Sequence, residues 1–415
     1  MKPKIRKDPL GTVLVIGTFN FPLILAVLPV IGAIAAGNAV VLKPSENSPH
    51  VAAVVERAVT SALDPSCYRI VQGAIPETTA LLDQKWDKIC YTGSTAVGTI
   101  IAKKAAETLT PYTLELGGRN AAIVTRNANV KLAARRLTWG KIQNAGQVCI
   151  SQNYNLVQDS VVDEFVAAMK TSLGQFYPSG TRNTEDYGRI VNARQFARIR
   201  ALLASTTGKI VHGGDMDEED RYISPTIVLC SSADDPILQE ESFGPLIPIL
   251  PFSTLDDAIK IAQSIDSTAL GFYPFGSDAE VARMLDAIRS GGVSINDGFV
   301  HGAIQTLAFG GIGSSGQGAY HGKASFDCFS HQRSVTKTPY WAEKLFEVRY
   351  PPYAGKVKKL RMLSASTPDF DRQGREVKLG FLRSLLGLGA KSPTGGLVRY
   401  LVVIVGKADS RFRRD

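Results

Sequence analysis

Cysteine and histidine are both scarce in this chain. Its 415 residues contain five of each. The cysteines are odd in number and irregularly spaced, with no Cys-x-x-Cys pair, and the histidines form no cluster at the spacing of zinc ligands. Disulfide scaffolds and structural zinc sites depend on such patterns. We therefore expect neither disulfides nor a bound metal, and we expect a reducing compartment.

Charged residues are also limited, at 20% of the chain, whereas 44% of the residues are hydrophobic. This composition is typical of a soluble enzyme with two or three buried cores. The net charge of +9 comes from residues 351–415, which hold 14 Lys/Arg against 5 Asp/Glu, while the first 350 residues hold 33 of each. Because no nucleic-acid-binding motif accompanies this basic tail, we predict no nucleic-acid partner.

No uninterrupted apolar run of membrane-spanning length is present. The longest candidate, Phe21–Leu42, is broken by Pro29, Gly32 and Gly37 and passes directly into a β-branched run. It predicts a buried helix followed by a buried parallel strand rather than a membrane span. The basic start, Met1–Lys7, lacks a small-residue cleavage site and is a poor secretory signal. We expect a cytoplasmic protein.

Short β-branched runs alternate with helical patterns in the first part of the chain. The expected strands are Val13–Ile16, Ala39–Leu42, Tyr68–Val71 and Lys88–Tyr91, with helices starting near Pro22, Ser48 and Ser94. This alternation predicts an α/β fold with a doubly wound parallel sheet, which binds nucleotides at the carboxyl ends of its strands.

The chain divides into four parts in this interpretation. Residues 1–115 form a dinucleotide-binding domain, and residues 116–322 form a second α/β domain that begins with a strand at Ala121–Val124. Residues 323–350 form a return strand and connector for oligomerisation. Residues 351–415 form a basic tail rich in Ser, Pro and Gly.

Three residues are candidates for chemistry, and each has a simpler alternative. Cys149 follows a helical pattern and would be a nucleophile if a base or positive field made it a thiolate; alternatively it is a small buried apolar residue. Glu115 lies between two leucines, where partial burial would suit a general base, or it is an exposed acid at a strand end. Asn20 lies in a turn, as an oxyanion donor or as a plain helix cap.

Two segments are candidates for cofactor binding. Lys43 and Glu46 follow an expected strand, where Lys43 would meet a phosphate or a ribose hydroxyl and Glu46 a ribose. Gly93–Gly98 ends another strand and opens a helix, whose positive terminus suits a pyrophosphate. It is not the Gly-x-Gly-x-x-Gly fingerprint, and alone it is equally a plain turn.

Taken together, seven motifs occur in the order shown by the aldehyde dehydrogenases and cover about residues 8–350. The motifs are Gly17–Pro22 (GTFNFP), Leu42–Glu46 (LKPSE), Gly93–Gly98 (GSTAVG), Leu114–Gly118 (LELGG), Asn144–Cys149 (NAGQVC), Glu241–Pro245 (ESFGP) and Phe309–Lys323. The segments that follow, including Val348–Tyr353, resemble the class 3 or fatty aldehyde dehydrogenase branch. Several motifs in the right order are more specific than any one of them.

The resemblance implies an aldehyde dehydrogenase fold, with the second α/β domain as the catalytic domain, and a role for each site residue. Cys149 would attack the aldehyde to give a thiohemiacetal and then a thioester, Asn20 would hold the oxyanion, and Glu115 would activate the hydrolytic water. NAD, or NADP, would be the cofactor and the protein a homodimer. The implied cofactor residues are Lys43, Glu46, Gly93, Ser94, Thr95, Ala96, Val97, Gly98, Glu241 and Phe243. His301 and His321 receive no role.

The resemblance leaves several alternatives open. Relatives usually begin with a helical segment that is absent here, so the start is either placed late or belongs to a natural short form. The substrate would be a fatty, aromatic or apocarotenoid aldehyde. An acyl-transferring (coenzyme A) or reductive enzyme, or an inactive interaction protein, are the alternatives. In the tail, the leucines between 379 and 386 and the apolar run 397–405 suggest an interfacial membrane anchor, or else a helix on the partner subunit or a disordered end.

Overall fold

The computed structural model describes residues 2–364, 373 and 375. The chain separates into two compact units, one formed by residues 7–331 and the other by residues 1–6 with 332–415. Each unit is considered by itself.

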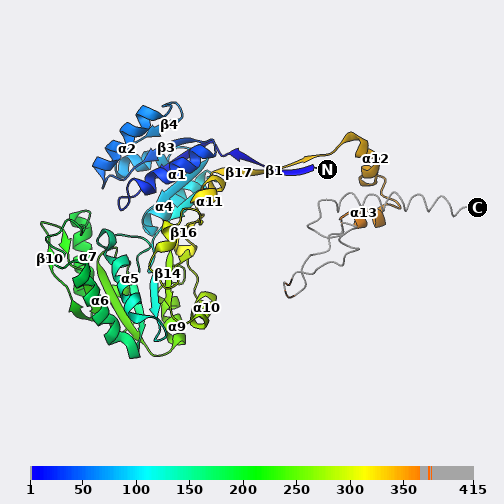
Figure 1. Ribbon diagram of the computed structural model, residues 1–415. Coiled ribbons are helices and arrows are strands. Elements are labelled where there is room, and N and C mark those ends of the chain that lie inside the picture. The colour runs from blue at the N-terminus through cyan, green and yellow to red at the C-terminus, as the bar shows by residue number, and fades with distance from the viewer. Residues whose placement is uncertain (1, 365–372, 374, 376–415) are drawn as a thin grey trace, which may run out of the picture. The chain divides into compact units, whose positions relative to one another are not determined.

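A six-stranded sheet forms the first half of the larger unit, drawn in blue and cyan with a yellow edge strand in Figure 1. Its strands, in spatial order, are β16 (Gly316–Gln317), β6 (Tyr112–Glu115), β5 (Lys88–Thr92), β2 (Thr12–Ile16), β3 (Ala39–Lys43) and β4 (Tyr68–Ile70). All neighbours are parallel except β16, which pairs antiparallel with β6 and places Gly316 opposite Glu115.

Helices cover both faces of this sheet, because its strands are apolar on both sides. One face carries α1 (Ile24–Ala35), α2 (Pro49–Ala62) and α11 (Gly322–Cys328), packed around residues such as Val13, Val15 and Leu42. The other carries α3 (Ile75–Leu82) and α4 (Thr95–Glu107), packed around Leu14 and Ile89. Sheets covered in this way are doubly wound.

A seven-stranded sheet forms the second half of the larger unit. Its order is β15 (Gly292–Val293), β14 (Gly271–Phe275), β7 (Ala121–Val124), β8 (Tyr154–Gln158), β13 (Leu246–Phe252), β12 (Thr226–Leu229) and β9 (Lys209–His212). Only the edge strand β9 runs antiparallel to its neighbour. The helices are α5 (Val130–Ile142), α6 (Val162–Phe176), α7 (Ala193–Ser205), α8 (Pro236–Gln239), α9 (Leu255–Ile265) and α10 (Asp278–Ala287), and a small hairpin joins β10 (Met216–Asp217) to β11 (Tyr222–Ile223).

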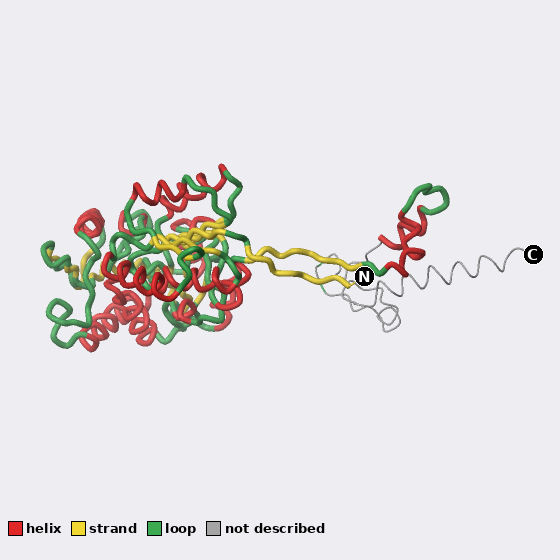
Figure 2. Tube along the Cα trace, turned by 90° about the horizontal axis from the view of Figure 1, so that it is seen from above, coloured by secondary structure: helices red, strands yellow, loops and turns green. Residues whose placement is uncertain are grey.

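The described part of the smaller unit contains parts of two long strands and two short helices. β1 (Lys2–Pro9) and β17 (Ser330–Lys337) run side by side as a two-stranded ribbon, seen from above in Figure 2. The helices are α12 (Glu343–Phe346) and α13 (Val357–Ser364). Across the described residues, no helix combines the length and apolar character needed to cross a bilayer.

The α/β fold class is confirmed, and the expected strands and helices are found within a few residues of their predicted places. The apolar run Phe21–Leu42 contains helix α1 and most of strand β3, as predicted. Strand β1 and helix α3 were not predicted. β1 is a basic strand without apolar alternation, and α3 buries no residue completely, so neither carries a strong pattern.

Candidate functional site

Cys149 lies three residues after a tight turn that ends helix α5. Asn144, Ala145 and Gly146 all have left-handed backbone angles, with φ of 48°, 51° and 77°. Two of these are not glycine, so the turn is strained and must be held by its surroundings. At Gly146 a Cβ would lie 2.2 Å from the carbonyl oxygen of Gly244, which shows how closely the Cys149 turn contacts the loop at 241–245.

Side-chain amides hold the turn from the cofactor side. The Asn144 amide donates to the Asn20 carbonyl at 2.9 Å, and the Asn20 amide donates to the Gln147 carbonyl at 3.1 Å. The Gln147 amide in turn donates to the carbonyls of Asn144 and Arg189, both at 3.0 Å. Asn20 is 8% exposed and belongs to the segment before α1. The structure therefore brings Asn20 to the Cys149 turn.

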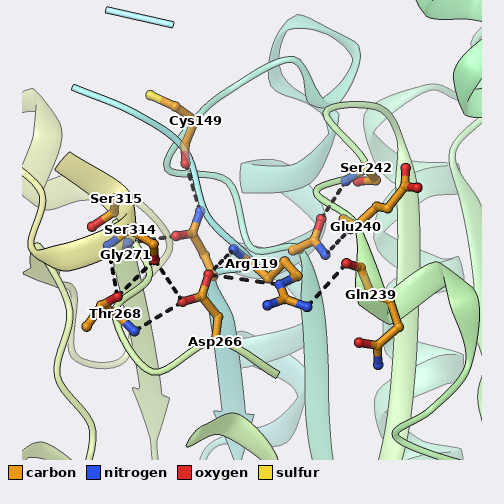
Figure 3. A network of polar contacts seen from close by, with 12 residues as sticks. Arg119, Cys149, Gln239, Glu240, Ser242, Asp266, Thr268, Gly271, Ser314 and Ser315 are labelled. Atoms are coloured by element: carbon orange, nitrogen blue, oxygen red, sulfur yellow. Dashed lines mark hydrogen bonds and ion pairs between the residues drawn. The ribbon is translucent and has the colours of Figure 1, made fainter. Parts of the chain in front are cut away.

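A second side-chain amide, that of Asn120, holds the backbone at Cys149, in the network of polar contacts drawn in Figure 3. Asn120 donates to the carbonyls of Cys149 and Ser151, both at 2.8 Å, and accepts from the Gly271 N–H at 2.7 Å. Asp266 continues this network to the backbone of Arg119 and Thr268. The peptide at Cys149 is therefore fixed to the start of strand β14.

The surroundings of the Cys149 side chain are apolar. It packs against a cluster of Val148, Ile150, Leu270, Phe309 and Tyr320, together with Leu28 and Phe299. Burial raises the pKa of the thiol to about 12, and the charges of Glu241 and Glu115 add to this effect. The free protein therefore holds Cys149 as a neutral thiol, in a setting that suits an apolar ligand.

Glu115 is buried, not exposed at a strand end. It is 2% exposed at the end of β6, between Thr92 of β5 and Gly316 of β16. Burial raises the pKa of its carboxyl group well above the usual range, and neither carboxylate oxygen has a hydrogen-bond partner among the described residues. Because its charge also acts on the Cys149 thiol, the two groups lie in one region. An unpaired buried carboxyl group near a thiol is typical of a functional site.

The cofactor candidates lie at the carboxyl ends of β3 and β5, the two strands on either side of β2 in the six-stranded sheet. Lys43, the last residue of β3, is 3% exposed, and its ammonium nitrogen lies 2.6 Å from a carboxylate oxygen of Glu46. Although burial raises the pKa of Glu46, the hydrogen bond and charge of Lys43 lower it overall. The pair therefore presents a fixed cation and anion to a ligand.

The segment Gly93–Gly98 turns from β5 into helix α4. Ser94 caps the helix by accepting from the Val97 N–H, while Thr95 and Ala96 form the exposed first turn. A Cβ at Gly93 would meet the Tyr91 hydroxyl at 2.2 Å, and one at Gly98 would meet Leu116 at 2.7 Å. The exposed first turn, at Thr95 and Ala96, is the positive end of helix α4, which fits a pyrophosphate.

Glu241 lies beside Gly117, in the segment that follows Glu115. A Cβ at Gly117 would lie 2.3 Å from a Glu241 carboxylate oxygen, and the Gly118 N–H donates to this group. Phe243, with a left-handed φ of 43°, makes an edge-on contact with Phe19 beside Asn20, with ring centroids 5.8 Å apart. This contact connects the Glu241 loop to the Asn20 turn.

The residues Asn120, Lys141, Asn153 and Arg198 were not found by sequence reasoning. Each holds backbone of the site through long-range hydrogen bonds, and a polar residue in such a role has no local sequence signal. His321 is buried and His301 partly buried, and both stack on Phe309, at centroid distances of 5.2 and 6.2 Å. Across the described residues no group of three or more His, Cys, Asp or Glu side chains could hold a metal ion.

The fold and these residues define a nucleotide-dependent oxidoreductase. The Lys43–Glu46 pair and the Gly93–Gly98 helix start lie at the carboxyl ends of β3 and β5, and the Glu241 carboxylate lies beside Gly117, just after β6. A cation, a helix start and carboxylates that accept from hydroxyls fit a dinucleotide.

The chain belongs to the aldehyde dehydrogenase family, which its residues 1–335 match. It is 50% identical over 410 residues to the beta-apo-4'-carotenal oxygenase of Neurospora crassa, covering 98% of this chain and 77% of that protein. It is 45% identical over 354 residues to the mouse (Mus musculus) dimeric NADP-preferring aldehyde dehydrogenase, covering 85% and 78%. The substrate-bound structure of Staphylococcus aureus AldH superposes with a TM-score of 0.83 at 41% identity, covering 86% and 78%. The protein is therefore an aldehyde dehydrogenase that uses NAD or NADP.

Substituting Gly146 with alanine should reduce kcat/KM by at least about a hundredfold, because a shift of about 1 Å at a reacting group costs that much. The new methyl group would meet the Gly244 carbonyl and displace the Cys149 turn. Steady-state NADH production measures the loss. Gly174→Ala in helix α6, where nothing lies within 4 Å, is the matched control and should leave kcat/KM unchanged. Equal kcat/KM values for the two variants would show that the close approach of Gly146 to the Gly244 carbonyl does not limit activity.

Proposed function

We propose that this enzyme oxidises an apolar aldehyde to its carboxylic acid, with Cys149 as the nucleophile. The observation that carries the proposal is the convergence of three groups from separate elements. Cys149 packs against an apolar cluster, and the Asn20 amide donates to a carbonyl of the Cys149 turn. The carboxyl group of Glu115 is buried close enough for its charge to act on the Cys149 thiol.

In the first step, the Cys149 thiol loses its proton to water, the thiolate sulfur attacks the carbonyl carbon, and the carbonyl oxygen gains negative charge. The Asn20 amide uses one N–H on the Gln147 carbonyl, which leaves its second N–H for this oxygen. The Cys149 backbone N–H is the other donor, and the hydrogen bonds of Asn120 to the neighbouring carbonyls fix its direction. NAD or NADP, when bound, accepts the hydride that converts the adduct to a thioester.

In the second step, Glu115 activates water. Burial raises the pKa of its carboxyl group, which makes the carboxylate a stronger proton acceptor, and neither of its oxygens has a hydrogen-bond partner among the described residues, so both can bind a water molecule. The water oxygen attacks the thioester carbon while its proton passes to Glu115. The carbon–sulfur bond then breaks, releasing the acid and the Cys149 thiolate.

The chain's own residues hold the cofactor in this proposal. Lys43 and Glu46 bind the adenosine ribose, and the exposed helix start at Ser94, Thr95 and Ala96, within Gly93–Gly98, binds the pyrophosphate. Glu241 receives the hydroxyls of the nicotinamide ribose, with Phe243 supporting the loop. We rank NAD first, with NADP also accepted.

An extended apolar tail suits the region around Phe299. This ring packs against the cluster that contains Cys149 and stacks on Trp139, with centroids 5.1 Å apart and planes 20° apart. Trp139 is 40% exposed, so the pair forms an aromatic wall from the thiol toward solvent. A conjugated or fatty tail would pack against it, in keeping with the carotenal named for the Neurospora relative.

Two alternatives keep the fold but not the reaction. Transfer of the acyl group to coenzyme A needs no water-activating base, so the buried Glu115 favours hydrolysis. An inactive interaction protein needs no convergence of Cys149, Asn20 and Glu115.

We also propose that the protein is a homodimer and binds intracellular membrane surfaces through its tail. A dimeric relative supports the first. In the smaller unit, Tyr340 and Trp341 are 100% and 70% exposed, which fits contact with a partner copy. The apolar tail segments at 379–386 and 397–405 lie outside the described residues, so the membrane anchor rests on their sequence alone.

Wild-type enzyme should produce NADH with apolar aldehydes of increasing length, and Cys149→Ser should lose nearly all turnover, by about 10³-fold or more, because a hydroxyl is a far weaker nucleophile in this apolar site. A panel of saturated, aromatic and polyene aldehydes, monitored at 340 nm, measures both. Cys67→Ser at an exposed thiol is the matched control and should retain full activity. Comparable turnover of the Cys149 variant would exclude it as the nucleophile.

Trp139→Ala should raise KM for a polyene aldehyde by about three- to tenfold, since an aromatic contact contributes about 0.5–1.5 kcal/mol. A two-carbon aldehyde does not reach the wall, so its KM should not change. Leu132→Ala, an exposed apolar position two turns earlier on α5, is the control. An equal change of KM for both aldehydes would remove the wall from the substrate site.

Full-length protein should sediment with anionic vesicles, whereas a chain ending at Tyr353 should stay in the supernatant, because the truncation removes both the basic residues and the apolar segments. Co-sedimentation with phosphatidylserine vesicles at low and high salt measures binding. Equal solubility of the two proteins would end the anchor proposal.

A further inference from the structure

The last turn of helix α5 contains a buried lysine, Lys141, that has no role in the reaction described above. Lys141 is 2% exposed, and its ammonium group donates to the Gln152 carbonyl at 3.0 Å and to the Ser242 hydroxyl at 3.1 Å. Placing an ammonium group in a protein interior is costly unless an opposite charge lies near it. The acid whose charge acts on Lys141 is Glu241.

The backbone of the Glu241 loop is held without Lys141. Asn153 accepts from the Ser242 N–H at 2.8 Å and donates to the Glu240 carbonyl at 3.0 Å. Arg198 donates to the carbonyls of Glu241 and Ser242, at 3.2 and 2.6 Å. Because these four hydrogen bonds already fix the backbone of the loop, the particular contribution of Lys141 is its charge rather than one more contact.

The Glu241 carboxylate needs such a charge. It lies against Gly117, is partly buried, and accepts the Gly118 N–H. Burial raises its pKa to about 7, while Lys141 and Arg198 act in the opposite direction. Asp266 opposes the ionised form, and the Cys149 thiolate, when it forms, does so too. Burial likewise lowers the pKa of Lys141 to about 7, and the attraction of Glu241 limits that fall.

We propose that Lys141 is a positioning residue that holds the Glu241 carboxylate as an anion above Gly117, ready to accept the hydroxyls of the nicotinamide ribose. The inference rests on the proposed role of Glu241. Lys141 touches neither substrate nor cofactor and acts through Glu241. It also connects the helix that leads into the Cys149 turn with the loop that binds the ribose, so the thiol and the nicotinamide keep a fixed relation.

The sign of the pH effect follows from this arrangement. A carboxyl group whose pKa is raised loses its charge, and with it its ribose contacts, as the pH falls through that pKa. Without Lys141 the pKa of Glu241 rises further. As the pH falls, a variant without the Lys141 charge should lose cofactor binding at a higher pH than the wild type does. At alkaline pH the two proteins should bind the cofactor equally well.

Lys141→Met tests the inference, because methionine keeps the length of the buried chain and removes the charge. A rise of one pKa unit from about 7 at Glu241 would lower its ionised fraction at pH 7 about fivefold. We expect the Kd for NADH, measured by calorimetry, to rise about fivefold at pH 7 and to match the wild type by about pH 9. The KM for NAD should follow, with kcat changed by less than about threefold.

Two control variants separate charge from packing. Ser242→Ala removes a Lys141 acceptor but keeps the cation, and its Kd should change little and equally at every pH. Lys88→Met removes another buried lysine, 7% exposed at the opposite end of β5 from Gly93, and should leave the Kd unchanged. Thermal unfolding confirms that each variant is folded.

Three results would overturn the inference. One is an unchanged Kd in Lys141→Met, and another is a rise that is the same from pH 6.5 to 9, which would indicate packing alone. In both of these cases Glu241→Gln should still raise the Kd for NADH, and the proposed contact between Glu241 and the nicotinamide ribose would be retained. The third is an unchanged Kd in Glu241→Gln, which would remove the ribose assignment together with the role of Lys141.

Discussion

The close contact between Gly146 and the Gly244 carbonyl is the constraint on which the rest of the site depends. Two loops that are far apart in sequence meet there backbone to backbone. Three left-handed residues bring the chain to this contact, and the amides of Asn20, Asn120 and Gln147 hold it in place. A side chain at the contact would separate the thiol from the Glu241 loop. The catalytic geometry therefore depends on a glycine that takes no part in the chemistry.

Burial explains the electrostatics of this region. Cys149, Glu115 and Glu241 all have raised pKa values, and burial is the first cause in each case. Burial therefore opposes the charged form of each group, and the charges of Lys141 and Arg198 partly offset this at Glu241. Perturbed thiol and carboxyl groups gathered in one region are typical of a functional site.

The sequence predicted the fold well wherever local patterns and burial agree. The β-branched runs of β2, β3 and β5 and the helix that follows each could be found because both faces of the sheet are covered and the runs are apolar throughout. Strand β1 could not be found, because it is basic and pairs only with the distant β17.

The residues of the candidate site likewise divide into those that a sequence motif indicates and those that no local pattern indicates. Cys149, Glu115, Asn20 and the cofactor residues lie in ordered motifs, so their resemblance to a family could be read from the sequence. Lys141 and Arg198 act across long sequence separations, through carbonyl oxygens that any residue supplies. Lys141 also lies in an amphipathic helix, where a lysine is normally expected on the solvent side. Only coordinates show that it points inward.

The antiparallel pairing of β16 with β6 has a consequence for biosynthesis. Glu115 ends β6, and its neighbour on that edge, Gly316, is made only after the whole seven-stranded sheet has been translated. A ribosome-bound chain can form the five parallel strands early, yet the carboxyl group stays at an open sheet edge until residues 316–317 emerge. The surroundings of Glu115 are therefore completed only after both sheets have been translated.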